Sequence, residues 1–109
     1  MRIAKRVLCR HWVHSYEEDT EAEKVFRPAD HAFPPSRGRL ELVLAPDGSA
    51  RVVHPGATDR PARSRGRWTL EGDLLEIDTP KDATPRRVYQ VVSSSAGKLV
   101  VRATASPRA

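Results

Sequence analysis

The sequence predicts an all-β fold, a small eight-stranded antiparallel barrel, and three observations favour it. Short segments alternate apolar and polar residues with the period of two that is typical of half-buried strands. Turn signals rich in glycine, proline and aspartate separate these segments at nearly even intervals. No segment carries a convincing helical stripe of apolar residues. Consecutive strands joined by tight turns pair antiparallel, so we expect a meander that closes on itself, with a two-sheet β-sandwich as the alternative.

The length and composition fit one domain, residues 1–109. A chain of 109 residues buries roughly two-thirds of the surface that its unfolded chain exposes, which allows one modest core. We expect order over about residues 7–103 and a frayed C-terminal tail. A single cysteine, no apolar run of ~20 residues and no recognisable signal peptide predict a cytoplasmic protein without membrane association.

The first expected strand covers residues 7–16, which are rich in β-branched and aromatic residues. We expect Trp12, His14 and Tyr16 to face inward, because their face has the larger ring area and aromatic rings contribute most to a small core.

An acidic segment, residues 17–23, follows this strand. Ser15 stands three residues before Glu18, as in a capping box, so a helical turn and a solvated loop both fit this segment. Residues 28–37 contain three prolines and are expected to form a connecting loop.

The clearest hairpin joins residues 38–45 to residues 50–54. Leucines at alternate positions of the first segment are expected to face the core. The turn between the two segments is Pro-Asp-Gly at 46–48, where proline presets φ and glycine accepts a positive φ.

Residues 64–70 alternate most cleanly, and the expected inward face carries Ser64, Gly66, Trp68 and Leu70. The outward face carries mostly arginine: Arg63, Arg65, Arg67 and Thr69. The remaining expected strands are short and separated by polar turns: 24–27, 74–78, 86–92 and 98–102.

The chain is basic, with a net charge of +5 and a pI of about 10.0. Arginines gather on both sides of Gly38 and again between residues 60 and 67. Such a pattern is typical of an anion or nucleic-acid footprint, but we favour the alternative of a solvated face that is partly neutralised by the acidic segment.

Five short segments stand out together: residues 12–19 (WVHSYEED), Arg27-Pro28, residues 33–39 (FPPSRGR), Asp59-Arg60 and residues 66–68 (GRW). In this combination the chain resembles a group of small, mostly uncharacterised bacterial β-barrel proteins that are lipocalin-like. The resemblance spans roughly residues 9–102 and implies a binding scaffold without implying an activity.

Metal and enzyme chemistry are weakly supported by the residues. His11 and His14 project to opposite faces of a strand, and Cys9 adds one ligand, whereas structural zinc needs four, so we expect no metal and no cofactor. Neither Cys9 nor Ser15 lies in a nucleophile elbow, so we expect no enzyme. The alternative enzyme would use His14 and Glu18 for acid–base chemistry.

We therefore expect a non-catalytic binding or accessory protein that reversibly binds a small molecule or short peptide, in a biosynthetic pathway. The candidate ligand-binding residues are interior rings and loop residues: Trp12, His14, Tyr16, Arg37, Arg39, Asp59, Arg60 and Trp68. If the rings fill the barrel, an outer groove or strand edge would bind an extended peptide, with arginines contacting its acidic side chains and a protein as the partner. Nucleic-acid binding is a weaker alternative, because Trp68 and the arginines fall on opposite faces. The oligomeric state is left open.

Overall fold

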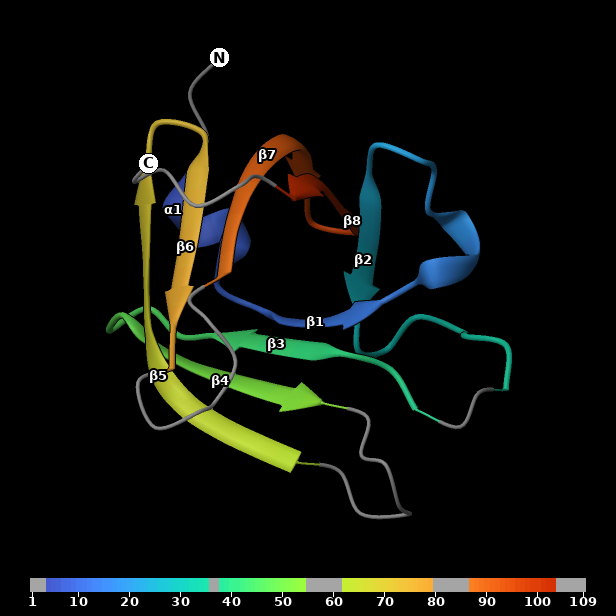
Figure 1. Cartoon of the computed structure of the whole chain (residues 1–109), viewed down its shortest axis with the longest axis horizontal. Coiled ribbons are helices and arrows are strands. Elements are labelled where there is room, and N and C mark those ends of the chain that lie inside the picture. Colours follow the sequence, from blue (N-terminus) through green and yellow to red (C-terminus); the bar gives the residue numbers. More distant parts are fainter. Residues whose placement is uncertain (1–3, 36–37, 55–61, 80–86, 104–109) are drawn as a thin grey trace.

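The structure is a computed structural model that describes residues 4–35, 38–54, 62–79 and 87–103. Eight antiparallel strands form one closed barrel (Figure 1), which confirms the predicted fold class over the sandwich. The strands are β1 (His11–His14), β2 (Lys24–Pro28), β3 (Glu41–Leu44), β4 (Ser49–His54), β5 (Ala62–Glu71), β6 (Leu74–Asp78), β7 (Arg87–Ser95) and β8 (Lys98–Ala103). A single helical turn, α1 (Lys5–Leu8), precedes β1, and a 3-10 turn, η1 (Tyr16–Glu18), follows it.

The strand order around the barrel is β1-β2-β8-β7-β6-β5-β4-β3, so a simple meander is the wrong description of the whole sheet. Strands β3 to β8 do form a meander, but β1 lies between β2 and β3, and β2 pairs with β8. The long proline-containing connection from β2 to β3 explains the difference. Only tight turns force consecutive strands to be neighbours, and this connection is not one.

The first predicted strand, residues 7–16, is also wrong at both ends. Only His11–His14 is a strand, and the chain before it coils into α1, so that Leu8 is fully buried in the core. The indole N–H of Trp12 donates to the carbonyl of Leu8 at 3.1 Å, which holds this turn against the start of β1. Packing of one leucine and one indole therefore overrides the extended conformation that the β-branched residues favour.

Strands β5 and β7 are longer than predicted. β7 continues to Ser95, across a segment that was expected to be a turn, because a β-bulge between Val91 and Ser93 lets the serines pair with β8. The predicted bounds of β6 are confirmed. The expected loops that contain residues 55–61 and 80–85, and the C-terminal tail, lie outside the described residues.

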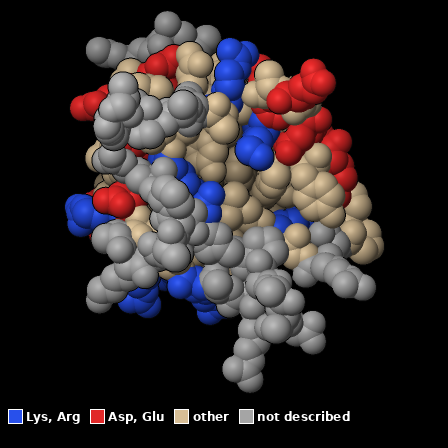
Figure 2. Space-filling view, in the orientation of Figure 1, with Lys and Arg blue, Asp and Glu red and all other residues tan. Residues whose placement is uncertain are grey.

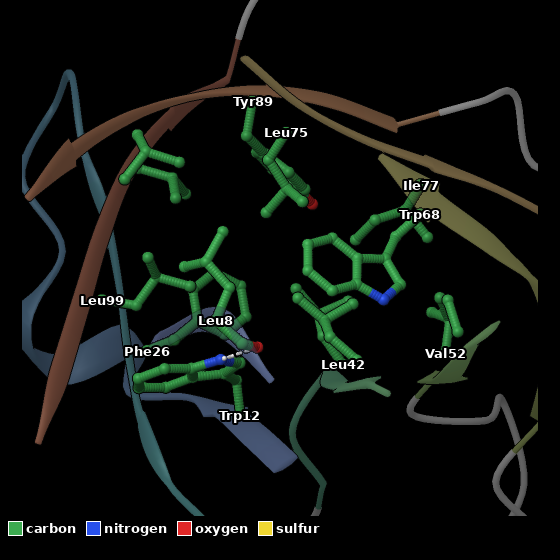
Figure 3. Packing of buried hydrophobic residues seen from close by; sticks show 14 residues of the cluster. Leu8, Trp12, Phe26, Leu42, Val52, Trp68, Leu75, Ile77, Tyr89 and Leu99 are labelled. Atoms are coloured by element: carbon green, nitrogen blue, oxygen red, sulfur yellow. Dashed lines mark hydrogen bonds between the residues drawn. The ribbon is translucent and has the colours of Figure 1, made fainter. Parts of the chain in front are cut away.

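The interior of the barrel is filled with apolar side chains (Figure 3). Trp12 is 0% exposed and Trp68 is 2% exposed, and aliphatic side chains lie between the two indoles. The second indole N–H donates to the carbonyl of Ala45 at 2.8 Å. Among the described residues, no buried side-chain nitrogen or oxygen lacks a hydrogen bond. The described core is therefore closely packed, and its buried polar side-chain atoms all have hydrogen-bond partners.

Strand β5 turns a corner of the barrel, which Figure 1 shows as the long bend in this strand. It pairs with β4 from Ala62 to Arg67 and with β6 from Arg67 to Glu71, so it exchanges neighbours at Arg67. Next to this point, a Cβ atom on Gly66 would lie 1.8 Å from the carbonyl oxygen of Asp78. The close approach of β6 to the inner side of the bend therefore requires glycine here.

We predict that Gly66→Ala destabilises the protein by about 2 kcal/mol or more, because two stretches of backbone must separate to accept the methyl group. The matched control is Gly97→Ala, where an added Cβ meets no atom within 4 Å. Urea unfolding followed by tryptophan fluorescence measures both variants. Equal stabilities of the two variants would contradict the corner geometry.

Candidate functional site

The four interior candidates do not surround an open space. Trp12 and Trp68 belong to the packed core, as described above. His14 lies at the margin of the core, stacked on Phe26 with ring centroids 5.1 Å apart, and its Nε2 lies 2.8 Å from a carboxylate oxygen of Asp19. Tyr16 leaves the barrel with η1 and is 44% exposed, so the expectation that it faces inward is wrong. The chain turns at Ser15 and thereby carries this ring outside.

Arg39 is embedded in protein contacts. Its side chain is only 7% exposed, and its guanidinium lies 4.6 Å from the Tyr16 ring centroid and 4.8 Å from that of Phe33. It donates two hydrogen bonds to the carboxylate of Glu17 and one each to the carbonyls of His14 and Pro34. The hydrogen bonds to Glu17 raise the pKa of Arg39. Together with the bonds to the two carbonyls, they fasten the loop before β3 onto η1.

The acidic segment 17–23 is neutralised by neighbouring strands. Glu18 accepts hydrogen bonds from Arg27 Nε at 2.8 Å, from Arg27 Nη2 at 2.7 Å and from the Ser15 hydroxyl at 2.8 Å. Arg27 and then Ser15 thereby lower the pKa of Glu18 from 4.5 to about 2. Of the two alternatives for this segment, a helical turn is present at its start as η1. Ser15 donates to the Glu18 side chain and does not cap a backbone N–H, so the capping-box geometry is absent.

The alternative acid–base pair of His14 and Glu18 is not formed. His14 bonds Asp19, whose second carboxylate oxygen accepts the Val25 N–H at 2.9 Å, while Glu18 bonds Arg27. A carboxylate with two guanidinium hydrogen bonds and a pKa of about 2 stays ionised near neutral pH, so it is a poor proton donor or acceptor there.

No metal centre is built by the residues that the structure describes, since no three His, Cys, Asp or Glu side chains there could share an ion. His11 Nε2 lies 2.6 Å from a carboxylate oxygen of Glu41 on the neighbouring strand. This contact is across the β1–β3 pair, and not toward His14.

Four exposed arginines of β4 and β5 form what we call the arginine face: Arg51, Arg63, Arg65 and Arg67. The register places Arg51 directly opposite Arg65. The Trp68 N–H donates to the carbonyl of Gly48, which makes Gly48 and Trp68 a hydrogen-bonded pair. Pairs alternate along an antiparallel ladder, so Arg51 and Arg65 form a non-hydrogen-bonded pair, the type in which side chains are closest.

Arg67 interacts electrostatically with the carboxylate of Asp47, in the turn before β4. Among the described residues, the guanidinium groups of Arg51, Arg63 and Arg65 have no carboxylate partner. This sets them apart from Arg27, Arg39 and Arg102, whose carboxylate partners lie in the acidic segment. Figure 2 shows a dense group of acidic side chains at the upper right, while basic side chains lie both near the top and at the lower left. Like charges directly opposite in a sheet are destabilising. Stability alone therefore does not explain this arrangement.

A shallow groove of about 390 Å³ runs over β3, β4 and β5 beside these arginines. Arg51 and Arg65 line it together with small and apolar residues: Val43, Ala45, Ser49, Ala50 and Gly66. The groove thus places two guanidinium groups beside small and apolar residues. Guanidinium groups bind carboxylates through paired hydrogen bonds, so this groove suits a carboxylate carried on an extended chain.

Sequence reasoning placed the β5 arginines on the outward face but did not count them among the candidate ligand-binding residues, and it missed Arg51. The alternation of Ala50 and Val52 toward the core marks Arg51 as outward, and the Pro-Asp-Gly turn fixes the hairpin register. Only the pairing of β4 with β5, which the connecting loop does not reveal, brings Arg51 opposite Arg65. Arg37, Asp59 and Arg60 lie outside the described residues.

The sequence matches no protein-family model, and no curated protein or solved structure is significantly similar to it. The resemblance to small bacterial lipocalin-like proteins therefore stays a prediction. Among the described residues, no helix is long and apolar enough to span a bilayer.

We predict that Glu18→Gln lowers the free energy of unfolding at pH 7 by about 1 kcal/mol, a value limited by solvent screening because the side chain is 33% exposed. The folded-state pKa of about 2 lies below the ordinary 4.5. The stabilisation is therefore complete above pH 4.5 and is lost as the pH falls through 2.

Urea unfolding at pH 7 and at pH 2 measures this effect. The difference between wild type and Glu18→Gln should shrink as the pH falls. Asp30→Asn, at an exposed carboxylate just after β2, is the control and should change little at either pH. A difference that is constant with pH would show that the Glu18 charge contributes nothing.

Proposed function

We propose that this protein is a non-catalytic binding protein that reversibly binds a carboxylate-bearing small molecule or short acidic peptide on its outer arginine face. The observation that carries the proposal is the direct opposition of Arg51 and Arg65, without a carboxylate partner among the described residues. A bound carboxylate would accept hydrogen bonds from both guanidinium groups and remove their repulsion.

The packed interior supports binding on the outside. Both indoles are buried, and each indole N–H already has a backbone acceptor. A ligand in the lumen would have to displace core side chains, each of which stabilises the fold by about 1.5–3 kcal/mol when buried. A ligand on the outer groove displaces only water.

The composition of the face favours a peptide or carboxylate over nucleic acid. Single-stranded nucleic acids bind where exposed aromatic rings stack on the bases. The described outward residues of β3, β4 and β5 include no aromatic ring, and Trp68 points the other way into the core. The arginine face therefore offers positive charge and a groove to a carboxylate or peptide, but its described residues offer no aromatic ring on which a nucleic-acid base could stack.

The single, partly buried Cys9 fits the reducing cytoplasm that the sequence predicts, and this compartment is part of the proposal. The proposal also includes the role of an accessory protein in a biosynthetic pathway. A bacterial lipocalin-like scaffold that binds without catalysing a reaction would bind an intermediate or a partner protein.

We predict that Arg65→Glu weakens binding of a fluorescein-labelled peptide of alternating glutamate and threonine by about tenfold or more, the equivalent of about 1.4 kcal/mol. Fluorescence anisotropy at low salt measures the affinity, and citrate serves as a small carboxylate competitor. Arg6→Glu is the control, because it makes the same charge change on α1, which packs against β7, and should change the affinity less than about twofold.

The same substitution tests folding. Glutamate opposite Arg51 replaces a repulsive pair by an attractive one, so Arg65→Glu should keep or raise the free energy of unfolding, by up to about 1 kcal/mol. Equal peptide affinities of wild type and Arg65→Glu, in a folded variant, would contradict the proposed function.

A further inference from the structure

Among the residues that the structure describes, the part of β5 beyond its corner has a strand on one side only. β4 pairs with β5 back to Ala62, whereas the pairing with β6 stops at Arg67. Among the described residues, the segment 62–66 therefore has a neighbouring strand at β4 and none at its other edge. Such an edge presents backbone N–H and C=O groups that an extended chain can bind.

The hydrogen-bond pattern identifies which residues present these groups. Because Trp68 bonds Gly48, the even-numbered residues of β5 direct their backbone groups toward β4. The odd-numbered ones direct theirs to the opposite edge, where Arg67 still meets β6. Arg63 and Arg65 thus direct their backbone groups to the edge that β6 has left, and their side chains to the arginine face.

We infer that the ligand of the arginine face is an extended acidic peptide that adds to β5 as an antiparallel strand beside residues 62–66. The inference rests on the proposed function, and it specifies the peptide over the small molecule. Added strands gain affinity from main-chain hydrogen bonds and specificity from alternate side chains.

The positive charges of Arg63 and Arg65 specify which peptide sequence would bind at this edge. Successive outward side chains of a strand lie two residues apart, about 6.6–6.8 Å. Arg63 and Arg65 are spaced in this way on the outward face. A peptide with glutamate or aspartate at every second position places each carboxylate directly opposite an arginine, in an attractive cross-strand pair. The residues between the glutamates direct their side chains to the opposite face of the added strand, and threonine is suited to these positions because it favours the extended conformation.

The antiparallel geometry also fixes which peptide amides bind. Residues opposite Arg63 and Arg65 exchange N–H and C=O bonds with them, so the glutamates of the peptide direct their N–H groups to β5. The residues between the glutamates direct their N–H groups to solvent. Methylation of a backbone nitrogen removes the N–H donor and adds bulk. Methyl groups on the glutamate nitrogens should therefore weaken binding, whereas methyl groups on the nitrogens of the residues between them should not.

Three peptides of eight residues with alternating glutamate and threonine test the inference by fluorescence anisotropy against the full chain. One is unmodified, one carries N-methyl groups on the central glutamates, and one carries them on the central threonines. We expect the N-methyl-glutamate peptide to bind about tenfold or more weaker than the unmodified peptide, and the N-methyl-threonine peptide to bind within about twofold of it.

Each other outcome decides against the inference. Equal binding of the two methylated peptides, strong or weak, excludes an added strand, and selective loss with N-methyl-threonine excludes the antiparallel register. In either of these two outcomes, the proposed function still stands, without the added strand, if the unmodified peptide binds and its affinity falls in Arg65→Glu. No binding of the unmodified peptide, or tighter binding of an oligothymidylate of similar length, overturns both.

Discussion

The closure of eight strands around two buried indoles is the constraint on which the rest of the structure depends. Trp12 and Trp68 are too large for a small barrel to bury unless the remaining inward positions are matched to them, and each needs an acceptor for its N–H. The carbonyls of Leu8 and Ala45 supply these acceptors, and both lie just outside strands. The need to satisfy the indoles thus shapes α1 and the turn before β4. It also leaves the barrel with a packed interior, which directs binding to the outside.

The charges of the molecule are divided by the same architecture. The segment between β1 and β2 carries the dense acidic run, and arginines from β2, from the segment before β3 and from β8 reach it. This network joins regions far apart in the sequence and accounts for the burial of Arg39. The arginine face receives none of these carboxylates. Within the described part of the chain, one set of arginines is paired with carboxylates, whereas Arg51, Arg63 and Arg65 lie together on adjacent strands without one. Such a surface is suited to an acidic partner.

The sequence predicted those features that depend on alternation within one segment. The inward row of β5 that ends in Trp68, and the arginines opposite it, follow directly from the period of two. It did not predict features set by distant packing. The turn at α1 depends on Leu8 meeting Trp12, and the position of β1 depends on a connection that carries no tight-turn signal. The site followed the same rule: Arg63 and Arg65 were visible in the alternation, whereas Arg51 required the pairing of two strands joined by a loop. Arg39 seemed available only because its partners are distant in sequence.

The most direct test of a closed interior with a binding outer edge is an NMR titration of the ¹⁵N-labelled protein with the unmodified alternating peptide. The guanidinium Nε–H signals of Arg51, Arg63 and Arg65 report the outer face, and the indole Nε1–H signals of Trp12 and Trp68 report the interior. The account predicts that the arginine signals shift with saturable dependence on peptide while both indole signals stay in place. Shifted indole signals with unchanged arginine signals would contradict it.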